Sequence, residues 1–177
     1  MSSWPAPSCG MGSVVDAASP TVEVKALTFP QSRFEPRDPD FERRVRASFA
    51  RQTFMTAIGA RVVAVAPGAV EIELGHADDL LQQHGFIHAG AIIAAVDSAA
   101  GYAAMSLMPA DAGVVTAELK INMLNPARAG PYRAYGRVLK PGRTLTVVEG
   151  RVTAGDGGAV HVLVGLFTMM RIDDPGD

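Results

Sequence analysis

The most apolar stretch of the chain runs from Ala91 to Met105 and contains one charged residue, Asp97. It follows a polar segment that ends in His84-Gly85-Phe86-Ile87-His88-Ala89-Gly90. The stretch predicts a helix, and a helix that is apolar on every side is usually buried. A carboxylate in such a helix is costly unless it is paired, hydrogen-bonded or protonated. Asp97 is therefore the first candidate for a catalytic group.

Periodic patterns on both sides predict the remaining elements. Asp38-Pro39-Asp40 can cap a helix, and apolar residues then recur at near-helical spacing to about Thr56. Those residues are Phe41, Val45, Phe49 and Phe54. Strands are expected at 61–65 and 70–74, separated by the Pro67-Gly68 turn. Apolar and polar residues alternate along the second strand, so one of its faces should be exposed to solvent.

Four more strands are expected after the central helix, at 114–124, 132–139, 145–154 and 160–170. Turn segments at 140–143 and 155–158 separate the last three at a spacing that suits antiparallel hairpins. Only a helix enclosed by the sheet has reason to be apolar all round. The order therefore predicts an α+β fold in which an antiparallel sheet wraps around one long central helix.

Composition narrows the class of protein. The 177 residues are 48% hydrophobic and 19% charged, which suits one globular domain, predicted at 38–177, after a Pro, Ser and Gly-rich arm at 1–37. The net charge is -2 and no Lys/Arg run occurs, so we expect no binding to nucleic acid or to an anionic membrane. The apolar run around the central helix is built largely from Ala and Gly and lacks the hydrophobicity of a membrane span. The single cysteine, Cys9, gives neither a disulfide framework nor a thiolate metal cluster, and a reducing cytoplasm fits.

Several short motifs follow one another in a specific order. They are Gly85-Phe86-Ile87-His88-Ala89-Gly90, then Asp97, then Thr116 to Asn122 with Asn125-Pro126, then Gly142-Arg143. In this order and spacing the sequence resembles the PaaI-like hotdog-fold acyl-CoA thioesterases over about 41–172. The resemblance implies the same fold, with the sheet as the bun and the central helix as the sausage, and hydrolysis of an acyl-CoA thioester without metal or other cofactor.

The resemblance assigns roles to five residues. Asp97 is the general base or the nucleophile, a choice that the sequence leaves open, and the Ala89 N-H donates to the oxyanion. Gln82 and Thr116 orient water or the thioester carbonyl, and His88 chiefly shapes the loop. The start of a helix suits an oxyanion donor, because its N-H groups are unpaired and the helix dipole is positive there.

Two positions depart from the family pattern. Ala89 replaces the usual first Gly of a pair; it retains the N-H, but its methyl group would narrow the acyl pocket, and it would fit poorly if the backbone there needs a positive φ. Gly101 stands where some relatives carry a Ser or Thr that helps orient water.

The resemblance also implies how substrate binds. Gly90 and Asn122 belong to the substrate-binding motifs, and the basic residues Arg128, Lys140 and Arg143 are expected near the CoA phosphates. A Met-rich acyl pocket that favours medium-chain or aromatic groups would draw on Phe54, Met55, Leu81, Met105 and Met123. In the family the site lies across a subunit interface, so we expect a homodimer or a homotetramer.

Two other readings of the sequence stay open. One is a non-catalytic protein that binds acyl-CoA or lipid, favoured by Ala89 and by the missing hydroxyl at Gly101. The other is a hotdog acyl-thioester hydratase, although such relatives usually pair a catalytic His with an acid in a different motif.

Overall fold

The computed structural model describes residues 34–155, 158 and 160–173. The predicted arm at 1–37 therefore lies almost wholly outside the described residues. Its last residues are described, and Phe34 packs against the hydrophobic core.

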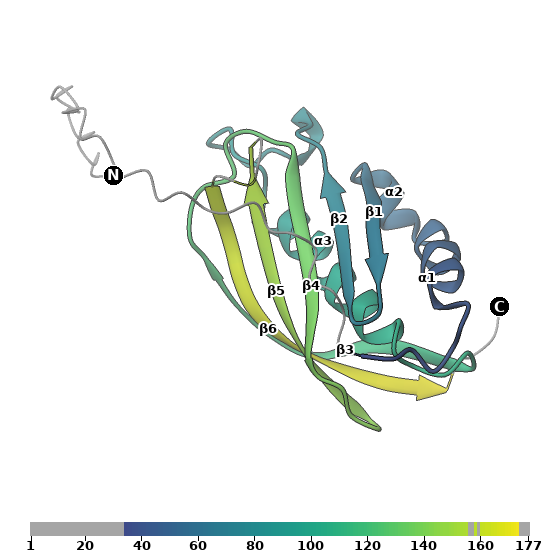
Figure 1. Ribbon diagram of the computed structural model, residues 1–177. Helices are drawn as coiled ribbons and strands as arrows, with labels where there is room; N and C mark the ends of the chain where they lie inside the picture. Colours follow the sequence, from purple (N-terminus) through teal and green to yellow (C-terminus); the bar gives the residue numbers. More distant parts are fainter. Residues whose placement is uncertain (1–33, 156–157, 159, 174–177) are drawn as a thin grey trace, which may run out of the picture.

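One six-stranded antiparallel sheet forms the body of the protein, in the order β1-β2-β4-β5-β6-β3 (Figure 1). The strands are β1 (Ala60–Ala66), β2 (Ala69–Leu74), β3 (Ala112–Met123), β4 (Tyr132–Lys140), β5 (Leu145–Ala154) and β6 (Val160–Asp173). The hairpins β1-β2, β4-β5 and β5-β6 join strands that are neighbours in the sequence, whereas β3 pairs with β6 and has a free outer edge. All six predicted strands are confirmed.

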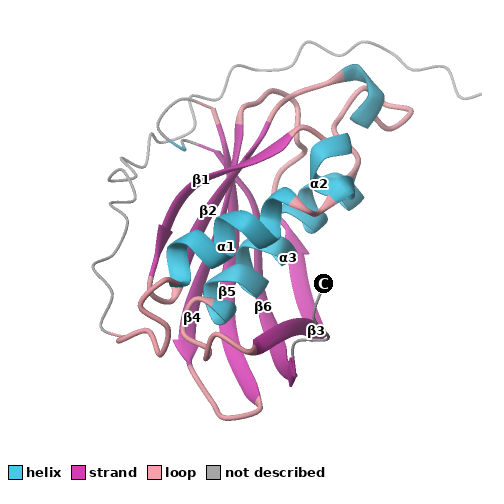
Figure 2. Ribbon diagram, turned by 90° about the vertical axis from the view of Figure 1, so that its right-hand side faces the viewer, coloured by secondary structure: helices cyan, strands magenta, loops and turns pink. Residues whose placement is uncertain are grey.

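The helix α3 (Ala89–Met105) lies in the curve of this sheet and contacts every strand. Figure 2 shows α3 and the shorter helices α1 (Phe41–Ala50) and α2 (Thr53–Ala57) on the same face of the sheet. The predicted α+β hotdog architecture is therefore confirmed. Within the described residues, no helix combines the length and hydropathy that a membrane span requires.

The single helix predicted from Asp38 to about Thr56 is wrong in one respect. It is broken at Arg51 and Gln52, and Gln52 has an extended backbone. No Gly or Pro marks the break. The Gln52 side chain instead bonds to two side chains of α3, so a tertiary contact decides the conformation that the local pattern did not predict.

Two glycines let α3 approach the sheet closely. A Cβ at Gly136 of β4 would collide with the backbone carbonyl of Ala99 in α3, and a Cβ at Gly150 of β5 would collide with Phe167 and Val96. The two glycines are direct partners in the β4-β5 register. The backbone of the sheet therefore contacts the middle of the helix directly, and this contact sets the distance between α3 and the sheet.

Arg44 of α1 fixes the other end of the helix. Its guanidinium donates to the carbonyl oxygens of Met105 (3.0 Å), Met108 (2.8 Å), Pro109 (2.6 Å) and Ala112 (3.2 Å). Its Nε lies 3.0 Å from the buried carboxylate of Asp38. Met105 is the last residue of α3 and the other three follow it, so Arg44 bonds to carbonyls at and after the helix end and ties α1 to this part of the chain.

Gly136→Ala should lower the free energy of unfolding by about 1–3 kcal/mol, because the new methyl group meets helix backbone that has no rotamer by which to move away. Urea unfolding measures this. Gly75→Ala is the matched control: a Cβ there has nothing within 4 Å, so it should shift stability by about 0.5 kcal/mol or less. Equal stability of the two variants would contradict the close-approach explanation.

Candidate active site

Asp97 lies on the side of α3 that lines a cavity next to β3. Its Oδ1 accepts a hydrogen bond of 2.8 Å from the Thr116 hydroxyl of β3. Burial raises the pKa of the Asp97 carboxyl above its ordinary value, and the hydrogen bond from Thr116 opposes part of that rise. Ser98, the next residue, donates elsewhere, to Gln52. Among the described residues Asp97 has no cationic partner, so it is a half-buried carboxylate without a salt bridge to neutralise it.

The start of α3 presents an unpaired backbone donor. His88 is the N-cap, and its Nδ1 accepts from the Gly90 N-H at 2.9 Å, while the Ala91 N-H donates to the His88 carbonyl oxygen. Within the described part of the chain, the Ala89 N-H has no acceptor. It is thus the free donor at the positive end of the helix dipole.

The backbone at Ala89 is ordinary. The described residues include no residue other than glycine with a positive φ, so the methyl group of Ala89 introduces no backbone strain there. The expected misfit of Ala89 through a positive φ is therefore absent, whereas the narrowing of an acyl pocket by its methyl group stays a prediction.

The geometry of His88 favours a structural role. Its Nδ1 lone pair caps the helix, so the neutral ring carries its proton on Nε2 and can only donate from that side. A Cβ at residue 90 would lie 3.0 Å from this Nδ1, which explains a glycine at Gly90.

Gln82 stands beside this helix start. Its Oε1 accepts from the His84 N-H at 2.7 Å, which orients the amide so that Nε2 remains as a donor. Gln82, His88 and Ala89 line one cavity of about 570 Å³, together with Phe86 and Met123.

Asp97 and Thr116 line a different cavity, of about 720 Å³, with walls from α1 and β3. Eight residues of α-helix separate Ala89 from Asp97, which is about 12 Å along the axis. A reacting carbonyl needs the oxyanion donor and the base each within about 3 Å of its own atoms. One chain therefore does not bring the Ala89 N-H and the Asp97 carboxylate together at one carbonyl.

Residues 84–161 match the thioesterase superfamily. A thioesterase family protein from Silicibacter pomeroyi, of known crystal structure, is 43% identical, and the match covers 75% of this chain and 98% of that chain with a TM-score of 0.72. The chain belongs to the thioesterase superfamily.

Two further solved structures share the fold of this thioesterase-superfamily chain. The PaaI protein of E. coli, from its phenylacetic acid degradation operon, is 19% identical over 76% of this chain and 95% of that chain, with a TM-score of 0.70. A Streptococcus mutans protein, solved with bound acetyl-CoA, is 27% identical over 66% of this chain and 91% of that chain, with a TM-score of 0.59. The resemblance to PaaI-like proteins of this superfamily is thus confirmed.

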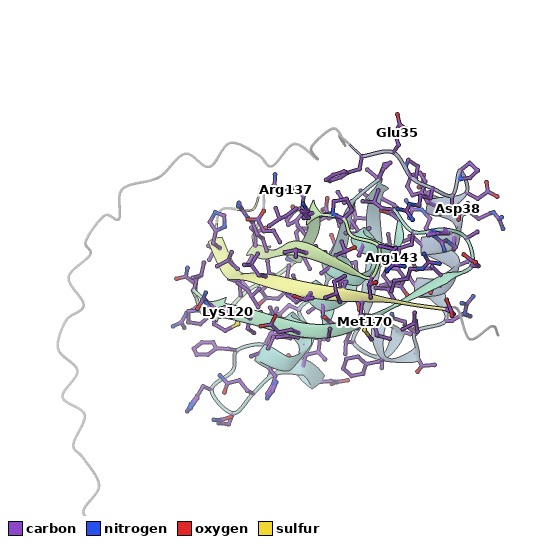
Figure 3. The ribbon with its side chains drawn as sticks, turned by 90° about the horizontal axis from the view of Figure 1, so that it is seen from below. Glu35, Asp38, Lys120, Arg137, Arg143 and Met170 are labelled. Atoms are coloured by element: carbon purple, nitrogen blue, oxygen red, sulfur yellow. The ribbon has the colours of Figure 1, made fainter. Side chains whose placement is uncertain are left out.

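The expected substrate-binding residues of this superfamily member lie apart in the single chain. Arg128 stacks over Phe86 at 4.4 Å, near the start of α3. Arg143 lies beside the cavity at the other end of α3, which Glu35 also lines; Figure 3 labels both residues. Lys140 is exposed at the end of β4. Asn122 pairs with Val164 and lines neither the Asp97 cavity nor the Ala89 cavity.

The five residues of the expected Met-rich acyl pocket lie apart in the single chain, where Met123 lines the cavity beside Ala89, and the pocket stays a prediction. Met55 is buried in the core, Phe54 is 57% exposed, and only Met105 of the five expected residues lines the cavity beside Asp97. Sequence reasoning missed the polar residues of that cavity, Ser48, Gln52 and Tyr102, because their positions read as parts of helix faces.

In the described residues, no three His, Cys, Asp or Glu side chains gather as they would around a metal ion.

Thr116→Val should raise the pKa of the Asp97 carboxyl further, because burial remains and the hydrogen bond that opposes it is lost. Carboxyl ¹³C NMR titration measures this, with Asp97→Asn to assign the signal. Thr116→Ser retains a hydroxyl and should keep the wild-type pKa. An unchanged or lower pKa in Thr116→Val would contradict the assigned geometry.

Proposed function

We propose that the protein is an acyl-CoA thioesterase that hydrolyses medium-chain or aromatic acyl-CoA to the free acid and CoA. The observation that carries this proposal is the pair of half-sites: a carboxylate with no cationic partner, and an unpaired helix N-terminal N-H. Membership in the thioesterase superfamily supports the reaction type. The acetyl-CoA bound by the Streptococcus mutans relative supports CoA as the thiol portion.

The site is completed by a second copy of the chain. In the proposed dimer, Asp97 of one copy faces the Ala89 N-H of the other, because the helix spacing keeps them apart within one copy. The free edge of β3 supports this arrangement: it is an unpaired edge of 12 residues, and it carries Leu119 and Met123, which are 39% and 43% exposed. A long exposed apolar edge is a ready surface for strand pairing.

Each residue of the proposed site has a separate role in the reaction. Asp97, held by Thr116, removes a proton from water as the water oxygen attacks the thioester carbon; direct attack by the carboxylate uses the same position. The Ala89 N-H and the Gln82 amide donate to the oxyanion that forms. When the intermediate collapses, the carbon-sulfur bond breaks, and the proton taken from water goes to the departing thiolate. His88 holds the helix start in place. Gly90, Asn122, Arg128, Lys140 and Arg143 are proposed to contact the CoA portion.

A proline at the first residue of a helix removes the backbone N-H, here the proposed oxyanion donor, without breaking the helix. Ala89 is the first helical residue, and His88 before it has φ -59° and ψ 134°, a conformation compatible with a following proline. Ala89→Pro should therefore fold but lower kcat by about 100-fold to 1000-fold on acyl-CoA esters, because it removes the N-H. Thiol release from esters of graded chain length and from aromatic esters measures this, with Asp97→Asn beside it.

Ala89→Gly is the matched control and should keep kcat within a few-fold of wild type, because it keeps the N-H. Full activity in Ala89→Pro would remove this N-H from the mechanism. Tight binding of the esters by wild type without any thiol release would favour the non-catalytic binding protein over the enzyme.

Mixing the two inactive variants tests the interface. If Asp97→Asn and Ala89→Pro chains are refolded together, half of the dimers are mixed, and each mixed dimer has one intact composite site, so about a quarter of wild-type activity should return. Thiol release after co-refolding measures the recovery, and each variant refolded alone is the control. A complete site within one chain would give no recovery.

A further inference from the structure

The cavity beside Asp97 and the cavity beside Ala89 differ in charge. Among the described residues, six with charged side chains line the Asp97 cavity: Asp38, Asp40, Arg43, Arg44, Arg51 and Asp97 itself. No described Asp, Glu, Lys or Arg lines the Ala89 cavity. A hydrocarbon chain laid against ionised side chains would strip them of water, which is costly. The Asp97 cavity is therefore a poor place for an apolar acyl group.

The Ala89 cavity offers apolar surface instead. Phe86, from the loop before α3, lines it together with Met123, which ends β3, and Leu124, which follows. The Leu124 side chain is largely open to solvent, with half of its surface exposed (50%). Removing such surface from water is favourable, so a hydrocarbon ligand would be stabilised here.

The two substituents of the thioester need different surroundings. In the proposed dimer, the Ala89 cavity of one copy and the Asp97 cavity of the other both open at the reacting carbonyl. The acyl chain and the sulfur leave the carbonyl carbon on opposite sides, so each takes one cavity. The pantetheine arm beyond the sulfur carries amides, which can bond to polar side chains and water, whereas an apolar acyl chain cannot.

We infer that the acyl group lies in the Ala89 cavity, and that Phe86, Met123 and Leu124 determine which acyl groups are accepted. The inference rests on the proposed thioesterase function, to which it adds the place of the acyl group and its specificity-determining residues. Of the five residues that the sequence suggested for an acyl pocket, this placement retains Met123 alone.

The test compares acetyl-CoA with octanoyl-CoA in wild type and in Leu124→Ala. The octanoyl chain extends along the cavity wall, whereas the acetyl group ends next to the carbonyl. Leu124→Ala should therefore lower kcat/KM about fivefold to tenfold on octanoyl-CoA and leave it within about twofold on acetyl-CoA. Thiol release from each ester measures the ratio of the two rates.

Two further variants serve as controls. Leu166→Ala makes the same truncation on β6, at a side chain of matching exposure (51%) that lines neither cavity, and it should keep the wild-type ratio. Val114→Ala probes the opposite placement, because Val114 lines the Asp97 cavity, and it should also keep the ratio. Loss of stability or of dimer would lower both rates equally and leave the ratio unchanged.

Two results would overturn the inference while leaving the thioesterase function intact: a wild-type ratio in Leu124→Ala, or a lowered ratio in Val114→Ala. If neither ester is hydrolysed by wild type, the proposed function itself fails.

Calorimetric binding decides the inference if either ester is not hydrolysed. Wild type should bind octanoyl-CoA more tightly than acetyl-CoA, and Leu124→Ala should lose most of this difference. Equal affinities in wild type, or an unchanged difference in Leu124→Ala, would overturn the placement of the acyl group.

Discussion

The depth at which α3 sits in the sheet governs the rest of the molecule. Gly136 and Gly150 expose bare backbone under the middle of the helix, so helix and sheet approach more closely than side chains would allow. Arg44 then fixes the helix end through four carbonyl oxygens. Asp97 lies at the level of the glycine contacts, which fall on Val96 and Ala99 of the same helix. Its position beside Thr116 is therefore set by packing and backbone hydrogen bonds far stiffer than a surface loop would provide.

A rigid helix also imposes a distance. The unpaired N-H at Ala89 and the carboxylate of Asp97 belong to the same straight element, and the rise of the helix keeps them too far apart to act on one carbonyl. In the proposed mechanism the same element supplies both groups, and its length prevents a single chain from using them together on one carbonyl. Association through the free edge of β3 is the simplest way to combine them, and it would cover the apolar residues exposed there.

The cavity beside Asp97 joins two kinds of surface. Strand β3 and Met169 contribute apolar side chains, whereas α1 contributes Ser48 and Gln52, which bond to Tyr102 and Ser98 of α3. The polar cluster holds α1 against α3, so the element that stabilises the cavity wall also gives that wall its chemistry.

The sequence alone determined the α+β architecture and the six strands and singled out Asp97 as a candidate, because hydrophobic periodicity and one carboxylate in an apolar helix are local signals. It also indicated the helix start at Ala89, and the motif order predicted the family. Tertiary structure decided the break at Gln52, the capping role of His88, the polar character of the cavity, and the separation of Arg128 from Arg143. Each of these depends on side chains that are distant in the sequence but meet across α1, α3 and the sheet, and no local pattern encodes such a meeting.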